Sequence, residues 1–145
     1  MTLSQAYPAT RHDIAPVIDL SDRAERDRLS AGAIRAFFNI MARWKVRDDV
    51  ARHLLGGISN GAFYGLKKGD HRTLDEDRLR RISYLVGIFK ALNILYSEDL
   101  ADQWMQRPNK NRIFGGMTPV NYLIRGGIPA FATVRKLLDA RRGGH

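Results

Sequence analysis

The stretch VRDDVARHLLGGISNGAFYGLKKG, residues 46–69, decides the fold that we expect. It opens with acidic residues, which the positive end of a helix dipole favours, and continues with apolar residues at helical spacing, namely Val50, Ala51, Leu54 and Leu55. Gly56 and Gly57 permit a sharp reversal, and Ser59 can cap a second helix that stops at Gly69. Two short helices joined in this way are the layout of a helix-turn-helix, whose second helix enters the major groove of DNA.

The polar side chains of this stretch are candidates for DNA contact. An asparagine can read adenine through two hydrogen bonds, and a lysine more often pairs with phosphate or guanine. The turn is about one residue longer than the common pattern, so the register of the second helix stays open, and Phe63 can equally belong to the core. The DNA-binding candidates are Arg47, Ser59, Asn60, Phe63, Tyr64, Lys67, Lys68 and Arg72.

Glycine recurs at every fourth position through the expected second helix, at Gly57, Gly61, Gly65 and Gly69. A glycine inside a helix costs about 0.8–1 kcal/mol relative to alanine, so the repeat needs a reason. The stripe could let a phosphate strand come close, or could pack closely on a neighbouring helix at residues 29–44; we favour the packing interpretation. A short or irregular second helix is the third alternative.

The remaining chain also has helical periodicity, and no alternation typical of strands. A helix over residues 29–44 has Ser30 as a candidate cap, and the pattern Thr73 to Glu76 predicts a capping box that starts a helix at Leu74. From Ile82 to Tyr96 that helix is apolar almost all round, which indicates either an internal core or a dimer interface. Further helices are expected over residues 97–105, 118–126 and from 129 onward, around a loop at 110–116.

The expected fold is therefore all-α, with a helix-turn-helix domain joined by a long central helix to a small helical C-terminal domain. The expected boundaries are a flexible arm at residues 1–23, the DNA-binding domain at 24–82 and the C-terminal domain at 83–145.

Charge and composition point to a polyanionic partner. The 145 residues carry a formal net charge of +9, with a net of +5 in residues 29–82 and again in 83–145. Neutralising phosphates with such bases releases counterions, which favours nucleic acid, although a basic surface can also simply serve solubility. There is no cysteine, no apolar run long enough for a membrane helix and no signal-peptide pattern. We expect a cytoplasmic protein without disulfides.

Enzymatic chemistry finds little support in the sequence. The four histidines, His12, His53, His71 and His145, are isolated from one another and from carboxylate pairs at metal-ligand spacing. No nucleophile elbow, phosphate-binding loop or dinucleotide fingerprint occurs. We expect no catalytic residue, no metal and no cofactor.

The C-terminal half resembles a known family. The ordered set Trp104-Met105, Pro108-Asn109, Phe114-Gly115-Gly116, Pro119, Leu123 and Gly126 is similar to the toxin-binding domain of the MbcA/ParS/Xre antitoxins. Residues 26–82 are similar to the Xre-like helix-turn-helix that precedes that domain, so the resemblance covers about residues 24–140.

The resemblance implies a type II antitoxin with two partners. One end would repress its own operon as a homodimer on a palindromic operator, and the other would block the active site of a RES-domain toxin that consumes NAD. The resemblance and the expected exposure give the toxin-binding candidates Arg107, Asn109, Asn111, Arg112, Phe114, Gly116, Met117, Asn121 and Arg125. The alternative is a stand-alone transcriptional regulator whose C-terminal helices only dimerise, and a more distant one is an RNA-binding or structural-assembly protein.

Overall fold

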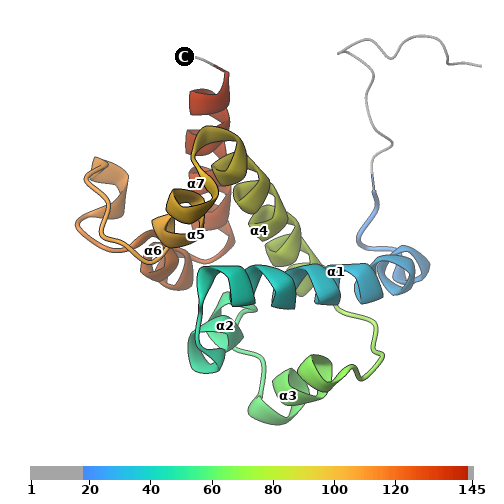
Figure 1. The fold of residues 1–145 in the computed structure, drawn as a ribbon. Helices are drawn as coiled ribbons and strands as arrows, with labels where there is room; N and C mark the ends of the chain where they lie inside the picture. The colour runs from blue at the N-terminus through green and yellow to red at the C-terminus, as the bar shows by residue number, and fades with distance from the viewer. Residues whose placement is uncertain (1–17, 144–145) are drawn as a thin grey trace, which may run out of the picture.

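A computed structural model describes residues 18–143. All regular structure in that part of the chain is helical, which confirms the expected fold class (Figure 1). Most of the expected arm, residues 1–17, lies outside the described residues. The elements are α1 (Arg23–Trp44), α2 (Asp48–Leu54), α3 (Asn60–Lys68), α4 (Glu76–Leu95), α5 (Glu98–Trp104), the 3₁₀ helix η1 (Arg112–Phe114), α6 (Pro119–Gly126) and α7 (Ile128–Arg142).

Helix α1 begins earlier than its apolar pattern predicted. Asp22 caps it by accepting a hydrogen bond from the Ala24 amide at 3.3 Å, so the helix starts at Arg23 and not near Leu29. The expected cap, Ser30, is instead a buried residue in the helix interior. Its hydroxyl donates to the Arg26 carbonyl at 2.6 Å and accepts from the Leu74 amide at 2.9 Å. Ser30 therefore joins α1 to the connector that precedes α4.

Helix α4 begins later than expected, for a similar reason. Asp75 is its cap and accepts from the Arg78 amide at 2.9 Å, so the helix starts at Glu76. Thr73, expected to be the cap, donates its hydroxyl to the Asp27 carboxylate on α1 at 2.7 Å. The connector between α3 and α4 is thus held to α1 by two side chains, and the capping-box interpretation was wrong.

Helix α4 is the centre of the molecule and packs against α1, α5 and α7 (Figure 1). Leu85, Ile88 and Leu92 are fully buried, so the apolar stretch of α4 forms the core of one chain. Burying such a side chain stabilises the fold by about 1.5–3 kcal/mol. Within residues 18–143, no helix is both long enough and apolar enough to cross a membrane.

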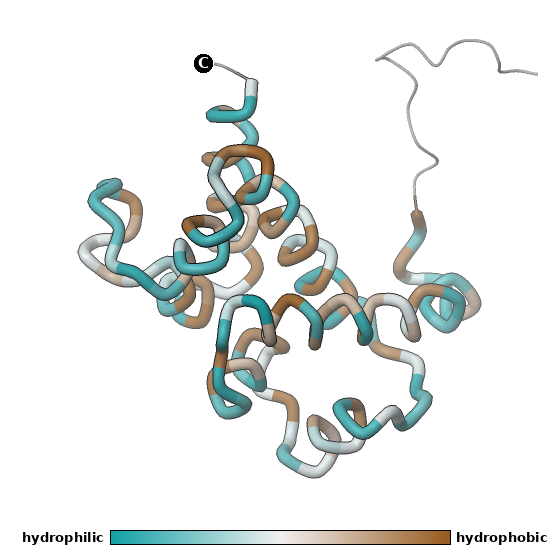
Figure 2. The backbone as a smooth tube through the Cα atoms, viewed as in Figure 1, coloured by the Kyte–Doolittle hydropathy of each residue, from teal (hydrophilic) through white to brown (hydrophobic). Residues whose placement is uncertain are grey.

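The helix-turn-helix and the C-terminal helices share one hydrophobic core. Figure 2 shows hydrophobic residues along α4 and α7, whereas hydrophilic residues dominate the loop between α5 and α6. An ion pair between Arg43 on α1 and Asp102 on α5, with 3.0 Å from Nε to Oδ2, joins the two halves at the surface. The Asp102 carboxylate raises the pKa of the Arg43 guanidinium by accepting its hydrogen bonds.

Candidate functional site

The helix-turn-helix is one of two candidate surfaces, and it forms at the residues that the sequence indicated. Gly56 and Gly57 adopt the left-handed conformation, with φ of 87° and 83°, in the turn between α2 and α3. Ser59 caps α3 by accepting from the Ala62 amide at 3.3 Å, and Gly69 ends the helix with φ of 105°. The Arg52 guanidinium donates to the Ile58 carbonyl at 2.7 Å and so fixes the turn from α2.

The structure exposes the candidates for nucleic-acid contact with one exception. Phe63 is fully buried and contacts the Phe38 ring on α1, with centroids 5.4 Å apart. Phe63 is therefore a core residue that holds α3 to the scaffold, and its prediction as a contact residue was wrong. The exposed candidates are Arg47, Ser59, Asn60, Tyr64, Lys67, Lys68 and Arg72.

The basic candidates differ in how much charge they can offer a ligand. Lys67 pairs with Asp48 on α2, with 2.8 Å between Nζ and Oδ1, and Arg47 pairs with Asp49 at 3.3 Å. Among the ion pairs within residues 18–143, none includes Lys68 or Arg72. Lys68 and Arg72 are consequently the cations of this surface whose charge no carboxylate offsets.

The four glycines have no common packing partner. Gly57 lies in the turn and Gly69 ends α3, so only two of them lie inside the helix. A methyl group at Gly61 would meet nothing within 4 Å, and one at Gly65 would meet the Asp70 carboxylate at 2.6 Å. Close packing of the stripe on α1 was therefore the wrong interpretation. Of the third alternative, a short or irregular helix, only the first part holds, because α3 is a regular α-helix of nine residues.

Gly61→Ala is expected to raise the free energy of unfolding by about 0.4–1 kcal/mol. The alanine methyl group meets no neighbour at this position, and the unfolded chain loses conformational freedom. Urea denaturation followed by circular dichroism measures the change. Gly57→Ala is the control, because φ of 83° strains an alanine and must lower stability instead; an increase at both positions would refute the argument.

The second candidate surface is the loop between α5 and α6, with α6 itself. Asn109 accepts from the Asn111 amide at 2.8 Å, and Asn111 accepts from the Ile113 amide at 3.1 Å. Thr118 then caps α6 by accepting from the Asn121 amide at 3.2 Å, with Pro119 in the first turn. These bonds give the loop a defined shape without any regular sheet or long helix.

A cluster of aromatic side chains supports this loop from the core side. The Phe114 ring is fully buried and meets the rings of Trp104 and Tyr122 edge-on, with centroids 5.8 and 5.2 Å apart. The prediction that Phe114 contacts a partner was therefore wrong; it supports the loop. The other candidates lie at the surface: Arg107, Arg112, Gly116, Asn121 and Arg125 are exposed, and Asn109, Asn111 and Met117 are half-buried.

The charge of the second surface is entirely positive. Residues 105–127 contain four bases, Arg107, Lys110, Arg112 and Arg125, and no acidic residue. Met117, Arg125 and Pro129 also border a hollow of about 280 Å³ between α6 and α7. A partner that covers this surface must bring acidic groups to its rim, because unpaired charges at an interface are costly.

Exposed apolar side chains near this surface were not among the predicted residues. Ile113 is 37% exposed at the tip of the basic loop, and Leu100 and Ile94 are 51% and 61% exposed on α5 and α4. Apolar residues surrounded by charged ones are typical anchors of protein interfaces. The apolar pair Ile113–Phe114 in a loop of polar residues and glycines is the sequence signal that could have drawn attention to Ile113.

Among residues 18–143, no three His, Asp or Glu side chains gather in a group that could hold a metal ion. The candidate surfaces carry exposed basic and apolar groups, which suit macromolecular partners better than small ones.

Comparison with known proteins identifies the C-terminal part of the chain. Residues 90–144 match the family model described as the antitoxin Xre/MbcA/ParS C-terminal toxin-binding domain. The chain is 36% identical to the uncharacterized protein y4oB of Sinorhizobium fredii (strain NBRC 101917 / NGR234) over 130 residues, 89% of this chain and 98% of that protein. No solved structure matches the chain.

Proposed function

The chain belongs to the Xre/MbcA/ParS antitoxin family, and from this premise we propose that it neutralises a RES-domain toxin and represses its own operon. The observation that carries the proposal is the position of the basic, acid-free surface inside the toxin-binding domain at residues 90–144. The protein needs no catalytic residue for this role. It is a type II antitoxin, and its activity is binding.

The toxin half of the proposal is occlusion of the toxin's active-site cleft. Ile113 supplies an exposed apolar anchor at the tip of a loop whose shape the Asn109 and Asn111 side chains fix. A pre-shaped loop loses little conformational entropy on binding, so more of its contact energy appears as affinity. Arg112 and Arg125 then pair with carboxylates around the cleft of a toxin that consumes NAD.

The DNA half of the proposal places α3 in the major groove of the operator. Asn60 and Tyr64 are exposed on α3, and Lys68 at its end offers an unpaired charge to a phosphate. Two copies of the chain would present two such helices to a palindromic site. Gly61 lets the backbone of α3 come close to the phosphate strand.

The test of the proposed function is co-expression with the toxin encoded by the neighbouring reading frame. The tagged chain should capture a RES-domain toxin and suppress its consumption of NAD, whereas Ile113→Asp should lose both effects. Tyr64→Asp is the matched control, since it places the same charge on the DNA surface and should retain toxin capture. A chain that binds operator DNA but never captures the toxin would instead support the stand-alone regulator whose C-terminal helices only dimerise.

Arg125→Glu should weaken the complex with the toxin at least about 10-fold, because reversing the charge places like charges opposite each other. Isothermal titration calorimetry measures the dissociation constant. Lys136→Glu on α7 is the control, because it makes the same charge change on an exposed residue outside the acid-free segment. Equal affinity of the Arg125 variant and the wild type would remove Arg125 from the interface.

Lys68→Ala should weaken operator binding and lower the slope of log K against log salt by about 0.9, the contribution of one phosphate contact. Fluorescence anisotropy with an operator duplex, titrated with salt, measures both quantities. Lys90→Ala, an exposed lysine on α4, should leave the slope unchanged. An unaltered slope in the Lys68 variant would show that Lys68 makes no phosphate contact.

A further inference from the structure

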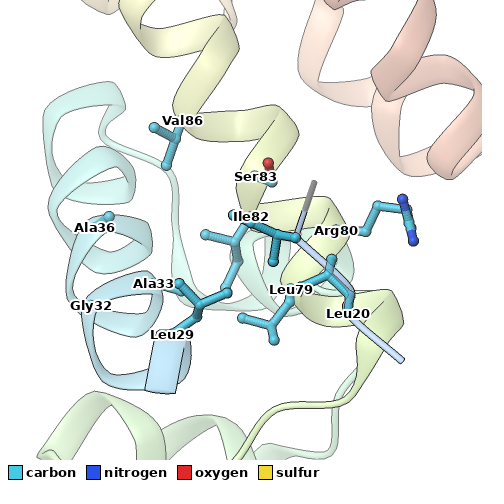
Figure 3. A pocket seen from close by; sticks show the side chains of 11 residues that line it. Leu20, Leu29, Gly32, Ala33, Ala36, Leu79, Arg80, Ile82, Ser83 and Val86 are labelled. Carbon is cyan, nitrogen blue, oxygen red and sulfur yellow. The ribbon is translucent and has the colours of Figure 1, made fainter. Parts of the chain in front are cut away.

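An apolar groove runs between α1 and α4, and none of its lining residues is a candidate residue of the two surfaces described above (Figure 3). It encloses about 550 Å³ and is lined by residues 29–36 of α1, residues 79–86 of α4 and the segment that precedes α1. Leu79 and Ile82 form part of its floor and belong to the core, while Ile18 at its edge is 50% exposed. The hydrophobic core of this chain therefore reaches the surface here.

The side chains on the α1 side of the groove are small enough for another helix to approach closely. Gly32, Ala33 and Ala36 line it, and a methyl group built on Gly32 would meet only the Arg35 side chain, at 3.8 Å. Small side chains let two helix backbones come close and so increase van der Waals contact. Ser83 and Arg80 supply the polar groups of the lining, which gives a small polar ligand little to bind.

The charge around the groove decides which partner it fits. The segments that line and flank the groove, residues 18–36 and 75–86, carry seven acids and seven bases, a net of zero in a chain whose total is +9. Each segment has both signs: Glu25 pairs with Arg28 at 2.9 Å on α1, and Glu76 pairs with Arg80 at 2.6 Å on α4. The positive charge of the protein therefore lies elsewhere on the chain.

We propose that this groove is the surface through which two copies of the chain form a dimer around a two-fold axis. Two molecules of charge +9 repel each other least where the surface is locally neutral. A two-fold interface brings the same patch of both copies together, so it requires a self-complementary patch. Mixed charges around an apolar centre meet that requirement, whereas a surface with no net positive charge offers a nucleic acid little attraction.

This inference deepens the proposed function, which requires two copies of α3 on one palindromic operator. The family model covers residues 90–144, whereas the residues that line the groove lie between positions 18 and 86. The groove is therefore outside the toxin-binding domain. A dimer formed at the groove thus leaves the basic loop of each copy available to a toxin.

Sedimentation velocity across the micromolar range tests the groove with the double variant Gly32→Glu, Ser83→Glu. Both residues are exposed and helical, and glutamate has a higher helix propensity than glycine or serine, so the single chain should stay folded. The wild type should sediment at twice 16.4 kDa. The variant should dimerise about 100-fold more weakly, because four glutamates are brought together in the apolar seam.

Ala42→Glu is the matched control, an exposed alanine of α1 that does not line the groove, and it should dimerise like the wild type. A monomeric wild type, or a double variant that dimerises as tightly as the wild type, would overturn the inference. Loss of toxin capture by the double variant without any change in mass would assign the groove to the toxin and would also overturn it. If no form captures the toxin but the variant still loses the dimer, the proposed function fails and the dimer surface stands.

Discussion

Phe114→Ala should lower the free energy of unfolding by about 3–5 kcal/mol, the range for deleting a buried phenylalanine ring from a core. Phe114 has no exposed surface, and its ring lies between those of Trp104 and Tyr122. Its loss leaves a cavity beneath the α5–α6 loop and removes two edge-to-face aromatic contacts. Urea denaturation followed by circular dichroism measures the change, and the toxin complex should weaken as well because the loop loses its support.

Ile113→Ala, at the position next to Phe114, tests contact with the toxin separately from structural support of the loop. Ile113 is 37% exposed, so its truncation should change stability by no more than about 0.5 kcal/mol. It should nevertheless weaken toxin binding, since it removes the proposed anchor. A supporting role for Phe114 would be refuted if Phe114→Ala kept the stability of the wild type and lost only toxin binding. Phe114 would then contact the toxin directly and would have to leave the core when the complex forms.

The sequence predicted the helices and several of their ends, because local patterns determine both. Ser59, Thr118 and Gly69 act as the predicted caps and stop, through bonds within a few residues of each other. The starts of α1 and α4 were misplaced because their hydroxyl residues make long-range bonds. Ser30 and Thr73 have partners 44 and 46 residues away, and no local pattern reveals such a partner.

For the candidate surfaces, the sequence indicated which residue types are present but not which of them are buried or paired. Charge and residue type can be read directly from the sequence, so Lys68 and Arg125 could be named as candidates, and the structure shows that both are exposed. The surroundings of a side chain cannot be read in the same way. Phe63 and Phe114 occur in segments rich in glycine and polar residues, where apolar periodicity is too short to show which face is buried. The ion pair between Lys67 and Asp48 likewise depends on how α3 lies against α2.

Ser30→Ala should lower the free energy of unfolding by about 1–3 kcal/mol, although it removes a single oxygen atom. The Ser30 side chain is buried, and its oxygen is the acceptor for the Leu74 amide at 2.9 Å. Without that oxygen a buried N–H group loses its partner and is shielded from water, which is the costly case for a hydrogen bond. Urea denaturation measures the stability, and hydrogen exchange at the Leu74 amide should become faster in the variant.

Thr133→Ala is the control for this substitution, because Thr133 is exposed on α7 and its hydroxyl donates only to the Pro129 carbonyl of the same helix. It should leave stability within about 0.5 kcal/mol of the wild type. The Leu74 amide lies on the connector that returns the chain from α3 to α4, so its release should also loosen α3 relative to α1 and weaken operator binding. Unchanged exchange at Leu74 in Ser30→Ala would mean that the amide keeps another partner, and the expected loosening of α3 relative to α1 would then be refuted.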